Sequence, residues 1–582
     1  MRKEILFIAI IALFASCSSN KKSEAISYEI NINKYIEQFC KRDNKEDIAA
    51  LKKNKFVAFD QVVEFYKNRN FKSVWVGERG VSSIFPKALL FIRSSMSYGF
   101  DTTVYVPNII DYAAQNISPK TFSFKANTNK IAVEMLTTHS LILFLNHINV
   151  GLLHPDSAIY GKPVKIAADS VPFFLEKAIQ GSDFSIASLA LAPKNPHYRD
   201  IQSALSQYLI NATITKEKYP IPYFAKDSSK CKEGVEKMLI VHGYLNKNTN
   251  KEPSENKVIP ALVKFQTDYG LNNRGRYDTI TIETLRNSSF DFYRKACLTL
   301  QRIRWSAISD KNYVLVNIPS FTLNLVEDGE IAVLHRIVAG KPDHETPELN
   351  SRISHFNLFP EWNVPHKIST KELLPLIQAD PKYLEKHNYE IINGKEEVVD
   401  ASKLKWKKYS EKNFPYRIRQ SSGEGNSLGI IKFYFPNEHG VYLHDTPSKK
   451  LFERNYRAFS HGCMRVQNPF VFAKILLEFK KGILHHTKEK LIKMGKYDQQ
   501  LKFEKYRKDK EQLPEVKTMN QDIQEVKKTT FTMNRPLPIY VRYLTAFINE
   551  KNKLQFYPDL YHKDSVLVIA FDKALNATTL FK

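Results

Sequence analysis

Hydrophobic residues recur at a helical spacing over the first part of the chain. The pattern is visible in Val62–Tyr66 and in a long apolar run from Ile131 to Val150. Aromatic side chains in this part are expected in a core, because no motif with its own chemistry accompanies them. The pattern predicts a mainly helical domain over residues 28–225.

From about residue 312 the apolar pattern changes to short β-rich runs. The predicted strands are residues 313–318, 322–326, 331–338, 353–359, 431–435 and 440–444. Glu327–Glu330 offers a hairpin turn between the second and third of them. An insertion at 366–425 contains helical stretches. The pattern predicts a mainly β domain over 305–485 with a helical insertion.

A helix is predicted directly after the last motif of this domain. Asn468 is a good N-cap residue, and Pro469 suits the first helical position. Residues 487–530 are rich in Lys, Glu and Gln and are predicted to be mostly helical, whereas 536–547 is β-rich. We expect residues 486–582 to form a helical and β extension.

The N-terminus has the pattern of an export signal. Arg2 and Lys3 precede an apolar run from Ile5 to Ala15, which is too short to span a bilayer as a helix. Residues 1–16 are therefore predicted to be a signal peptide. Phe14–Cys17 resembles a bacterial lipobox, which would place a lipid on Cys17 and make 17–27 a lipidated linker. The alternative is an ordinary secreted protein with an incidental Cys17.

Composition narrows the class of protein. The 582 residues are 43% hydrophobic and 12% aromatic, which is typical of globular domains and leaves room for several of them. The net charge of +25 is strongly basic. Nucleic acid is not expected as a partner, because the chain looks exported and has no helix-turn-helix, RRM or zinc-finger pattern. Attraction to an anionic wall or lipid surface fits better, with a merely solvated basic surface as the alternative.

Cysteine usage gives no disulfide framework. Besides Cys17 the chain has Cys40, Cys231, Cys297 and Cys463. If Cys463 stays a thiol, three remain, which is an odd number for pairing. Cys231 and Cys297 bracket a small module and could pair, or they could be two unrelated buried thiols.

The strongest chemical signal is the run Ser460–Val466, which contains Cys463. A cysteine attacks acyl groups as a thiolate and needs a base, most often histidine, and His444 lies 19 residues upstream. Gly462 allows a tight turn before the thiol, which would leave backbone N–H groups free for an oxyanion. Two other readings remain: a buried small cysteine, or a zinc site that uses His444, His461 and Cys463.

Ser460–Arg465 with the upstream histidine resembles the signature of the L,D-transpeptidases, the YkuD-fold enzymes of bacterial cell-wall synthesis. Further segments resemble the large, periplasmic YcbB-like branch of that family: 313–319, 340–342, 346–347, 362–365, 417–420, 426–429 and 432–437. The resemblance implies a multidomain α+β protein in which 28–225 is a scaffold domain and 366–425 caps the cleft of the catalytic domain. It also implies that the extension over 486–582 completes this β-rich catalytic unit.

Residues 231–290 resemble a peptidoglycan-binding module of type 1, which is a three-helix unit. Phe265–Gln266 and Gly270–Leu271 carry the likeness. The family's second glycine before the last helix is missing, since Gly275 is followed by Arg276. Glycan binding and a purely structural use of the module therefore both stay open.

The family resemblance also implies a mechanism. Cys463 attacks a peptidoglycan tetrapeptide stem, releases D-alanine and holds a thioester, with His444 as the base. His461 and Ser460 would order the thiol loop, Gly462 and Cys463 would supply oxyanion contacts, and Arg465, Trp362 and Asn363 would contact substrate. A structural ion pair is the alternative for Arg465.

The implied product is a 3→3 cross-link made during cell-wall biogenesis, with peptidoglycan stem peptides and, through the lipid anchor, a membrane as partners. No metal or organic cofactor is implied, and carbapenems are expected to acylate the cysteine. Water as acceptor would instead give an L,D-carboxypeptidase or a cross-link hydrolase, and the lysine of an envelope protein is another acceptor. The alternative that is not an enzyme is a wall-binding lipoprotein without catalytic activity.

Overall fold

The structure is a computed structural model of the chain. It describes residues 32–41, 56–77, 80–117, 124–153, 170–246, 255–306, 308–423, 425–480, 513–549 and 553–578. Two compact units are present, one formed by Met1–Ser309 with Thr545–Lys582 and the other by Asp310–Leu544. The expected signal peptide (1–16), the linker (17–27) and Cys17 lie outside the described residues.

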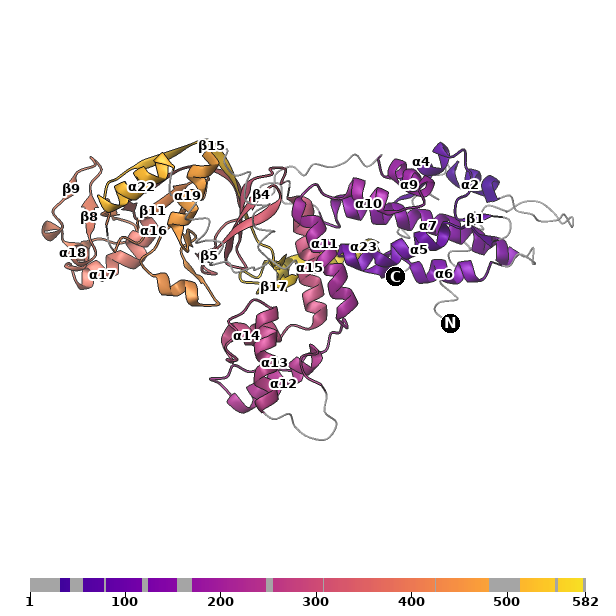
Figure 1. The fold of residues 1–582 in the computed structure, drawn as a ribbon, viewed down its shortest axis with the longest axis horizontal. Coiled ribbons are helices and arrows are strands. Elements are labelled where there is room, and N and C mark those ends of the chain that lie inside the picture. Colours follow the sequence, from indigo (N-terminus) through magenta and orange to yellow (C-terminus); the bar gives the residue numbers. More distant parts are fainter. Residues whose placement is uncertain are drawn as a thin grey trace. The chain divides into compact units, whose positions relative to one another are not determined.

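Helix α7 (Phe124–Val150) is the centre of the N-terminal part of the first unit (Figure 1). The helices that pack on it are α2 (Ile32–Cys40), α4 (Phe59–Asn68), α5 (Phe85–Arg93), α6 (Pro107–Gln115), α9 (Ser170–Gln180) and α10 (Ser185–Leu191). By length and composition alone Thr128–Val150 could cross a membrane, but 94% of its apolar window is buried inside the protein. The expected helical domain is therefore built around one core helix.

Glu134 is a fully buried carboxylate on α7. It accepts hydrogen bonds from the backbone N–H groups of Val74 (2.7 Å), Trp75 (2.8 Å) and Val76 (3.1 Å) and from the Tyr66 hydroxyl (2.8 Å). Burial raises its pKa to about 7 in spite of these donors. Glu134 thereby fixes the segment that leads into the small hairpin β1–β2 (Val76–Gly77 and Gly80–Val81).

Three short helices follow, after α11 (Pro196–Asn211), in the region that resembles a peptidoglycan-binding module. They are α12 (Ser228–Val241), α13 (Glu255–Asp268) and α14 (Thr279–Leu285) (Figure 1). Phe265 is fully buried among them, and the Gln266 amide bonds the Arg276 carbonyl (2.9 Å), the Thr281 hydroxyl (3.1 Å) and the Gly275 N–H (2.9 Å). The Phe265–Gln266 pair thus holds the loop before α14.

The cysteines among the described residues are all free thiols. Cys231 on α12 and Cys297 on α15 (Ser289–Trp305) are both buried free thiols, as is Cys40. Cys231 and Cys297 therefore form no disulfide.

The C-terminal segment belongs to the first unit. After Leu544 the chain forms the hairpin β16–β17 (Ala546–Ile548 and Leu554–Phe556) and helix α23 (Lys563–Thr578), which pack on α15. Asp564 makes a buried ion pair with Arg302 (2.5 Å) and accepts a hydrogen bond from the Thr545 hydroxyl. The described residues from Thr545 onward group with the first unit and do not complete the β-rich unit as expected. The reason is that Phe547 and Phe556 are buried against His197 and Phe292 of the first unit.

The second unit is built on a nine-stranded sheet with the order β13-β5-β14-β12-β11-β6-β15-β3-β4, in which β5 also pairs with β4. The sheet therefore closes on itself like a barrel. Its strands are β3 (Tyr313–Asn317), β4 (Thr322–Glu327), β5 (Glu330–Gly340), β6 (Leu349–Leu358), β11 (Ile431–Tyr434), β12 (Leu443–His444), β13 (Ala458–Ser460), β14 (Met464–Val466) and β15 (Thr530–Arg542). The expected hairpin turn joins β4 to β5, with positive φ at Asp328 and Gly329.

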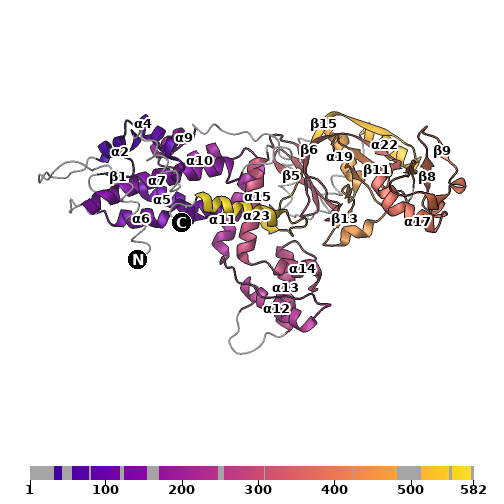
Figure 2. The ribbon, with the colours of Figure 1, turned by 180° about the vertical axis from the view of Figure 1, so that it is seen from behind.

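Helices cover part of this sheet. Helix α19 (Pro469–Lys480) begins at the expected proline and packs on β15 and on α22 (Pro514–Gln524), as Figures 1 and 2 show. Residues 481–512 lie outside the described part, so the long helical layer expected over 487–530 is seen only at α22. Strand β15 begins at Thr530, six residues before the expected β-rich run.

The insertion over residues 366–425 combines short helices with a sheet of its own. The helices are α16 (His366–Ile368), the π-helical turn η3 (Ser369–Leu373), α17 (Leu374–Ala379) and α18 (Tyr383–Lys386). The four-stranded sheet has the order β7-β10-β8-β9, formed by Trp362–Asn363, Arg417–Gln420, Tyr389–Ile392 and Val398–Val399. Leu374, Ile377, Ile391 and Trp406 share its core, so it is a mixed α/β subdomain where a helical one was expected.

Candidate active site

Strand register places the predicted histidine and cysteine on one face of the sheet. Strands β12 and β14 run parallel with His444 opposite Arg465, and β11 places Lys432 opposite His444. Paired residues point to the same face, and so do residues two apart on an extended strand. Tyr442, two before His444, and Cys463, two before Arg465, therefore join the same face.

The alternate residues of these strands form the core on the other face. Phe433, Leu443 and Met464 are fully buried, and Phe433 contacts Phe472 of α19 with ring centroids 4.9 Å apart. A one-residue shift of register would exchange the two faces. Packing against α19 therefore fixes which side chains face the site.

The Cys463 thiol sits in a partly buried, electropositive environment. Burial raises its pKa, although hydrogen bonds from the Tyr442 backbone and hydroxyl and the charges of Lys432 and Arg465 act in the opposite direction. The thiol form therefore dominates at neutral pH. The same contacts would stabilise the thiolate once a base removes the proton.

His444 is the histidine that shares this face of the sheet with the thiol. Its ring is buried, and its Nδ1 lies 2.5 Å from the Asp445 carbonyl oxygen, which accepts the Nδ1 hydrogen. Burial and the nearby Arg465 charge lower the pKa of His444 to about 3. The ring is therefore neutral in ordinary conditions, and its lone pair is on Nε2.

The loop before the thiol is fixed by its own hydrogen bonds. The Ser460 hydroxyl donates to the Cys463 carbonyl (2.5 Å) and accepts from the Gly462 N–H (3.2 Å), and Thr346 donates to the Gly462 carbonyl (2.8 Å). Gly462 has φ +108°, a conformation that side chains with a Cβ rarely adopt. The Gly462 N–H is engaged, whereas the Cys463 N–H has no acceptor within the described part of the chain, which leaves the latter for an oxyanion.

Trp362 lies beside Tyr442, whereas its neighbour Asn363 is on the opposite side of β7. The Trp362 side chain hydrogen-bonds the Tyr442 hydroxyl, which in turn bonds Cys463. Both residues lie on β7, where neighbouring side chains point to opposite sides. Asn363 is exposed.

Arg465 has no acidic partner among the described residues, and its buried Nε lacks a hydrogen bond there. The ion-pair reading of Arg465 is thus not supported. A half-buried guanidinium without an acidic partner is instead suited to an anionic ligand.

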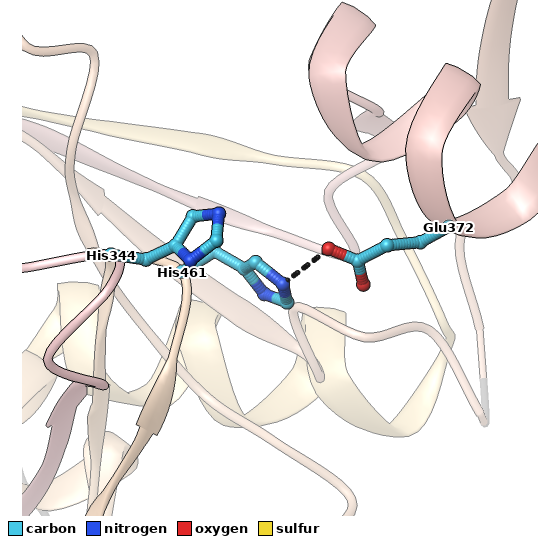
Figure 3. A group of neighbouring side chains, drawn as sticks. All are labelled: His344, Glu372 and His461. Carbon is cyan, nitrogen blue, oxygen red and sulfur yellow. Dashed lines mark hydrogen bonds and ion pairs between the residues drawn. The ribbon is translucent and has the colours of Figure 1, made fainter.

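The contacts of His461 do not support a role as the base for Cys463. Its Nε2 lies 2.7 Å from Glu372 Oε1 of the capping insertion, and its ring lies beside His344 with centroids 5.0 Å apart (Figure 3). His344, Glu372 and His461 are the one metal-ligand grouping among the described residues. The zinc site that sequence reasoning considered, with His444, His461 and Cys463, is therefore not assembled.

Sequence reasoning missed two members of the site. Tyr442 could have been found, because it lies two residues before His444 in a predicted strand and so shares its face. Nothing in the local sequence indicates that Lys432 lies at the site, because its place opposite His444 depends on the pairing of β11 with β12.

Comparisons with known proteins agree with this architecture. Residues 311–481 match the family described as the L,D-transpeptidase catalytic domain, and residues 60–205 match the Scaffold domain. The chain is 32% identical over 278 residues to the "Putative L,D-transpeptidase" of Haemophilus influenzae, a match that covers 48% of this chain and 49% of the relative. The chain therefore matches about half the length of that relative.

One solved structure, the Ldtfm–avibactam carbamoyl enzyme, was also matched. It covers 38% of this chain and 77% of its own, with 15% identity and a TM-score of 0.15. A likeness with so low a TM-score supports no conclusion about the fold or the function of this chain.

Proposed function

We propose a function from the premise that residues 311–481 belong to the YkuD family of L,D-transpeptidase catalytic domains and residues 60–205 to the Scaffold domain family. The enzyme class follows from the catalytic domain. The proposal is that the chain forms 3→3 cross-links in peptidoglycan through a thioester on Cys463. The observation that supports it most is the single sheet face that carries Cys463, His444 and Tyr442.

The first step is removal of the thiol proton. His444 is neutral with its lone pair on Nε2, so it can accept the Cys463 proton as the sulfur attacks. The charges of Lys432 and Arg465 and the Tyr442 hydroxyl stabilise the negative sulfur. The sulfur bonds to the carbonyl carbon at the L-centre of the third stem residue.

The second step releases the terminal D-alanine. The tetrahedral oxyanion is stabilised by the Cys463 N–H, and His444 returns the proton to the leaving amine as the C–N bond breaks. An acceptor amine then attacks the thioester, gives a proton to His444, and the proton returns to the thiol. Arg465 is proposed to bind a carboxylate of a stem peptide.

Export to the periplasm and a lipid on Cys17 are part of the proposal and rest on the N-terminal pattern alone. A basic chain of net charge +25 suits an anionic wall or membrane surface. Acylation of Cys463 by carbapenems is proposed on the same family basis.

Mass spectrometry of muropeptides tests the reaction. The purified chain without residues 1–17 is incubated with disaccharide-tetrapeptide beside a Cys463→Ala variant and an active transpeptidase as positive control. A cysteine-dependent dimer with loss of D-alanine supports the proposal. Tripeptide without dimer would indicate an L,D-carboxypeptidase, and no change in either sample would favour a wall-binding protein.

A further inference from the structure

His344, Glu372 and His461 converge at the surface from three separate segments of the second unit. One possible ligand atom from each residue lies within 4.8 Å of the other two, and Figure 3 shows the two imidazoles and the carboxylate facing one another. Their side chains are 41%, 43% and 29% exposed, respectively. An ion from solution could therefore reach all three.

The fold holds each of the three segments. The loop that carries His344 is closed by a bond from the His344 N–H to the Lys341 carbonyl (2.8 Å), and the Lys341 N–H donates to the Ser460 carbonyl (3.0 Å). His461 lies in the loop that Ser460 and Thr346 fix. The positions of His344 and His461 are thus coupled by the backbone.

Glu372 comes from the capping insertion. It lies on η3, a π-helical turn in which its neighbour Leu373 is buried in the core of the insertion. A π-helical turn is rare and is often found at functional sites. Its carboxylate bridges to His461, so the contact joins the insertion to the loop of Cys463.

Two imidazoles and one carboxylate form a ligand set that zinc uses in sites with an open fourth position. Tetrahedral bonds of about 2.0–2.2 Å place ligand atoms roughly 3.4 Å apart, so side-chain shifts of about 1 Å would suffice. Asp343 adds an independent observation: its Oδ2 lies 3.3 Å from His344 Nδ1. A carboxylate on Nδ1 is the usual outer partner of a metal-bound histidine and leaves Nε2 for the ion.

We propose that His344, Glu372 and His461 bind a divalent transition-metal ion of the zinc type, with water in the fourth position. The ion would tie the capping insertion to the loop that carries Cys463. The thiol chemistry proposed above needs no metal, so this site is a separate property of the protein. Its role would be to restrain the movement of the insertion.

Zinc binding to a Cys463→Ala chain tests the site, because the catalytic thiol is then absent as a competing ligand. Zinc is titrated into the full chain against a chromogenic chelator, and Mg²⁺ serves as the negative control. We expect one zinc per chain at this site. Further substitution of His344→Ala or Glu372→Gln should weaken binding at least tenfold, because each removes one of three ligands.

The matched control is His439→Ala, since His439 is 42% exposed and also lies beside an acidic residue, Glu438. This variant should bind zinc like its parent. X-ray absorption should show nitrogen and oxygen ligands only, with one imidazole fewer in His344→Ala. The proposal is overturned if the parent binds no zinc, if both ligand variants keep its affinity, or if a sulfur ligand appears.

This experiment requires no turnover. Its result is therefore independent of the muropeptide assay, and failure of one proposal is distinguishable from failure of the other.

Discussion

The Tyr442 hydroxyl hydrogen-bonds the sulfur of Cys463, and Trp362 bonds the same hydroxyl from the strand that leads into the capping insertion. The Cys463 thiol is thereby connected to two aromatic side chains as well as to its loop. A hydroxyl that donates to sulfur favours the thiolate, so Tyr442 opposes the rise in the pKa of Cys463 that burial causes.

Tyr442→Phe should raise the pKa of Cys463 further, because it removes a donor to the charged form. A hydrogen bond to a charged group contributes about 1.5–3 kcal/mol, so the rate of Cys463 alkylation near pH 8 should fall roughly tenfold or more. Site-resolved mass spectrometry after iodoacetamide treatment across pH measures this. Tyr434→Phe is the control, since Tyr434 is exposed on the neighbouring strand. If the alkylation rate of Tyr442→Phe depends on pH as in the parent, the Tyr442 hydroxyl does not lower the pKa of Cys463.

His444 should give an unusual pH profile. Its pKa is about 3, well below the ordinary 6.5, so the ring stays neutral and able to accept a proton as the pH falls through 6.5. Acyl-enzyme formation should therefore show no acid limb between about pH 5 and 8, and His444→Gln should lower its rate roughly 10²–10⁴-fold. The rate is measured by quenching the reaction at successive times and determining the acylated fraction of the protein by mass spectrometry. A limb centred near 6.5 that disappears in His444→Gln would contradict the neutral, low-pKa ring.

Glu134 should make the helical domain less stable as the pH rises. Its folded pKa of about 7 is above the ordinary 4.5, so its stabilising contribution is fully present below 4.5 and is lost as the pH passes through 7. The shift of 7 − 4.5 = 2.5 units corresponds to about 3 kcal/mol. The protection factors of the amides of residues 74–76, which are their exchange rates corrected for the intrinsic effect of pH, should fall over this range. In Glu134→Gln these protection factors should not change with pH over the same range.

Asp564 should anchor the C-terminal segment to the first unit. Asp564→Ala removes the carboxylate that forms the buried ion pair with Arg302, which costs about 3–5 kcal/mol, so limited proteolysis should cut within residues 553–578 far more readily. Asp572→Ala is the matched control, because its pair with Arg294 is partly exposed and should cost less than about 1 kcal/mol. Equal protease resistance of all three chains would show that the hairpin and α23 are held by apolar packing alone.

The sequence by itself determined the strands β3 to β6 and β11 and the loop that carries Cys463. Alternating apolar residues and the turn Asp328–Gly329 are local signals, and so are Pro469 at the start of α19 and the glycine before Cys463. These features depend on neighbouring residues along the chain, which is why pattern reasoning found them. The likeness of the motif to a known family supplied the enzyme class.

Only the tertiary structure decided which side chains meet. Lys432 reaches the site through the pairing of β11 with β12, and Glu372 reaches His461 across 89 residues of chain. The grouping of residues 545–582 with α15 likewise depends on long-range burial around Arg302 and Asp564. Contacts between distant segments arise from packing and register, and a periodic pattern in one segment carries no information about its partner.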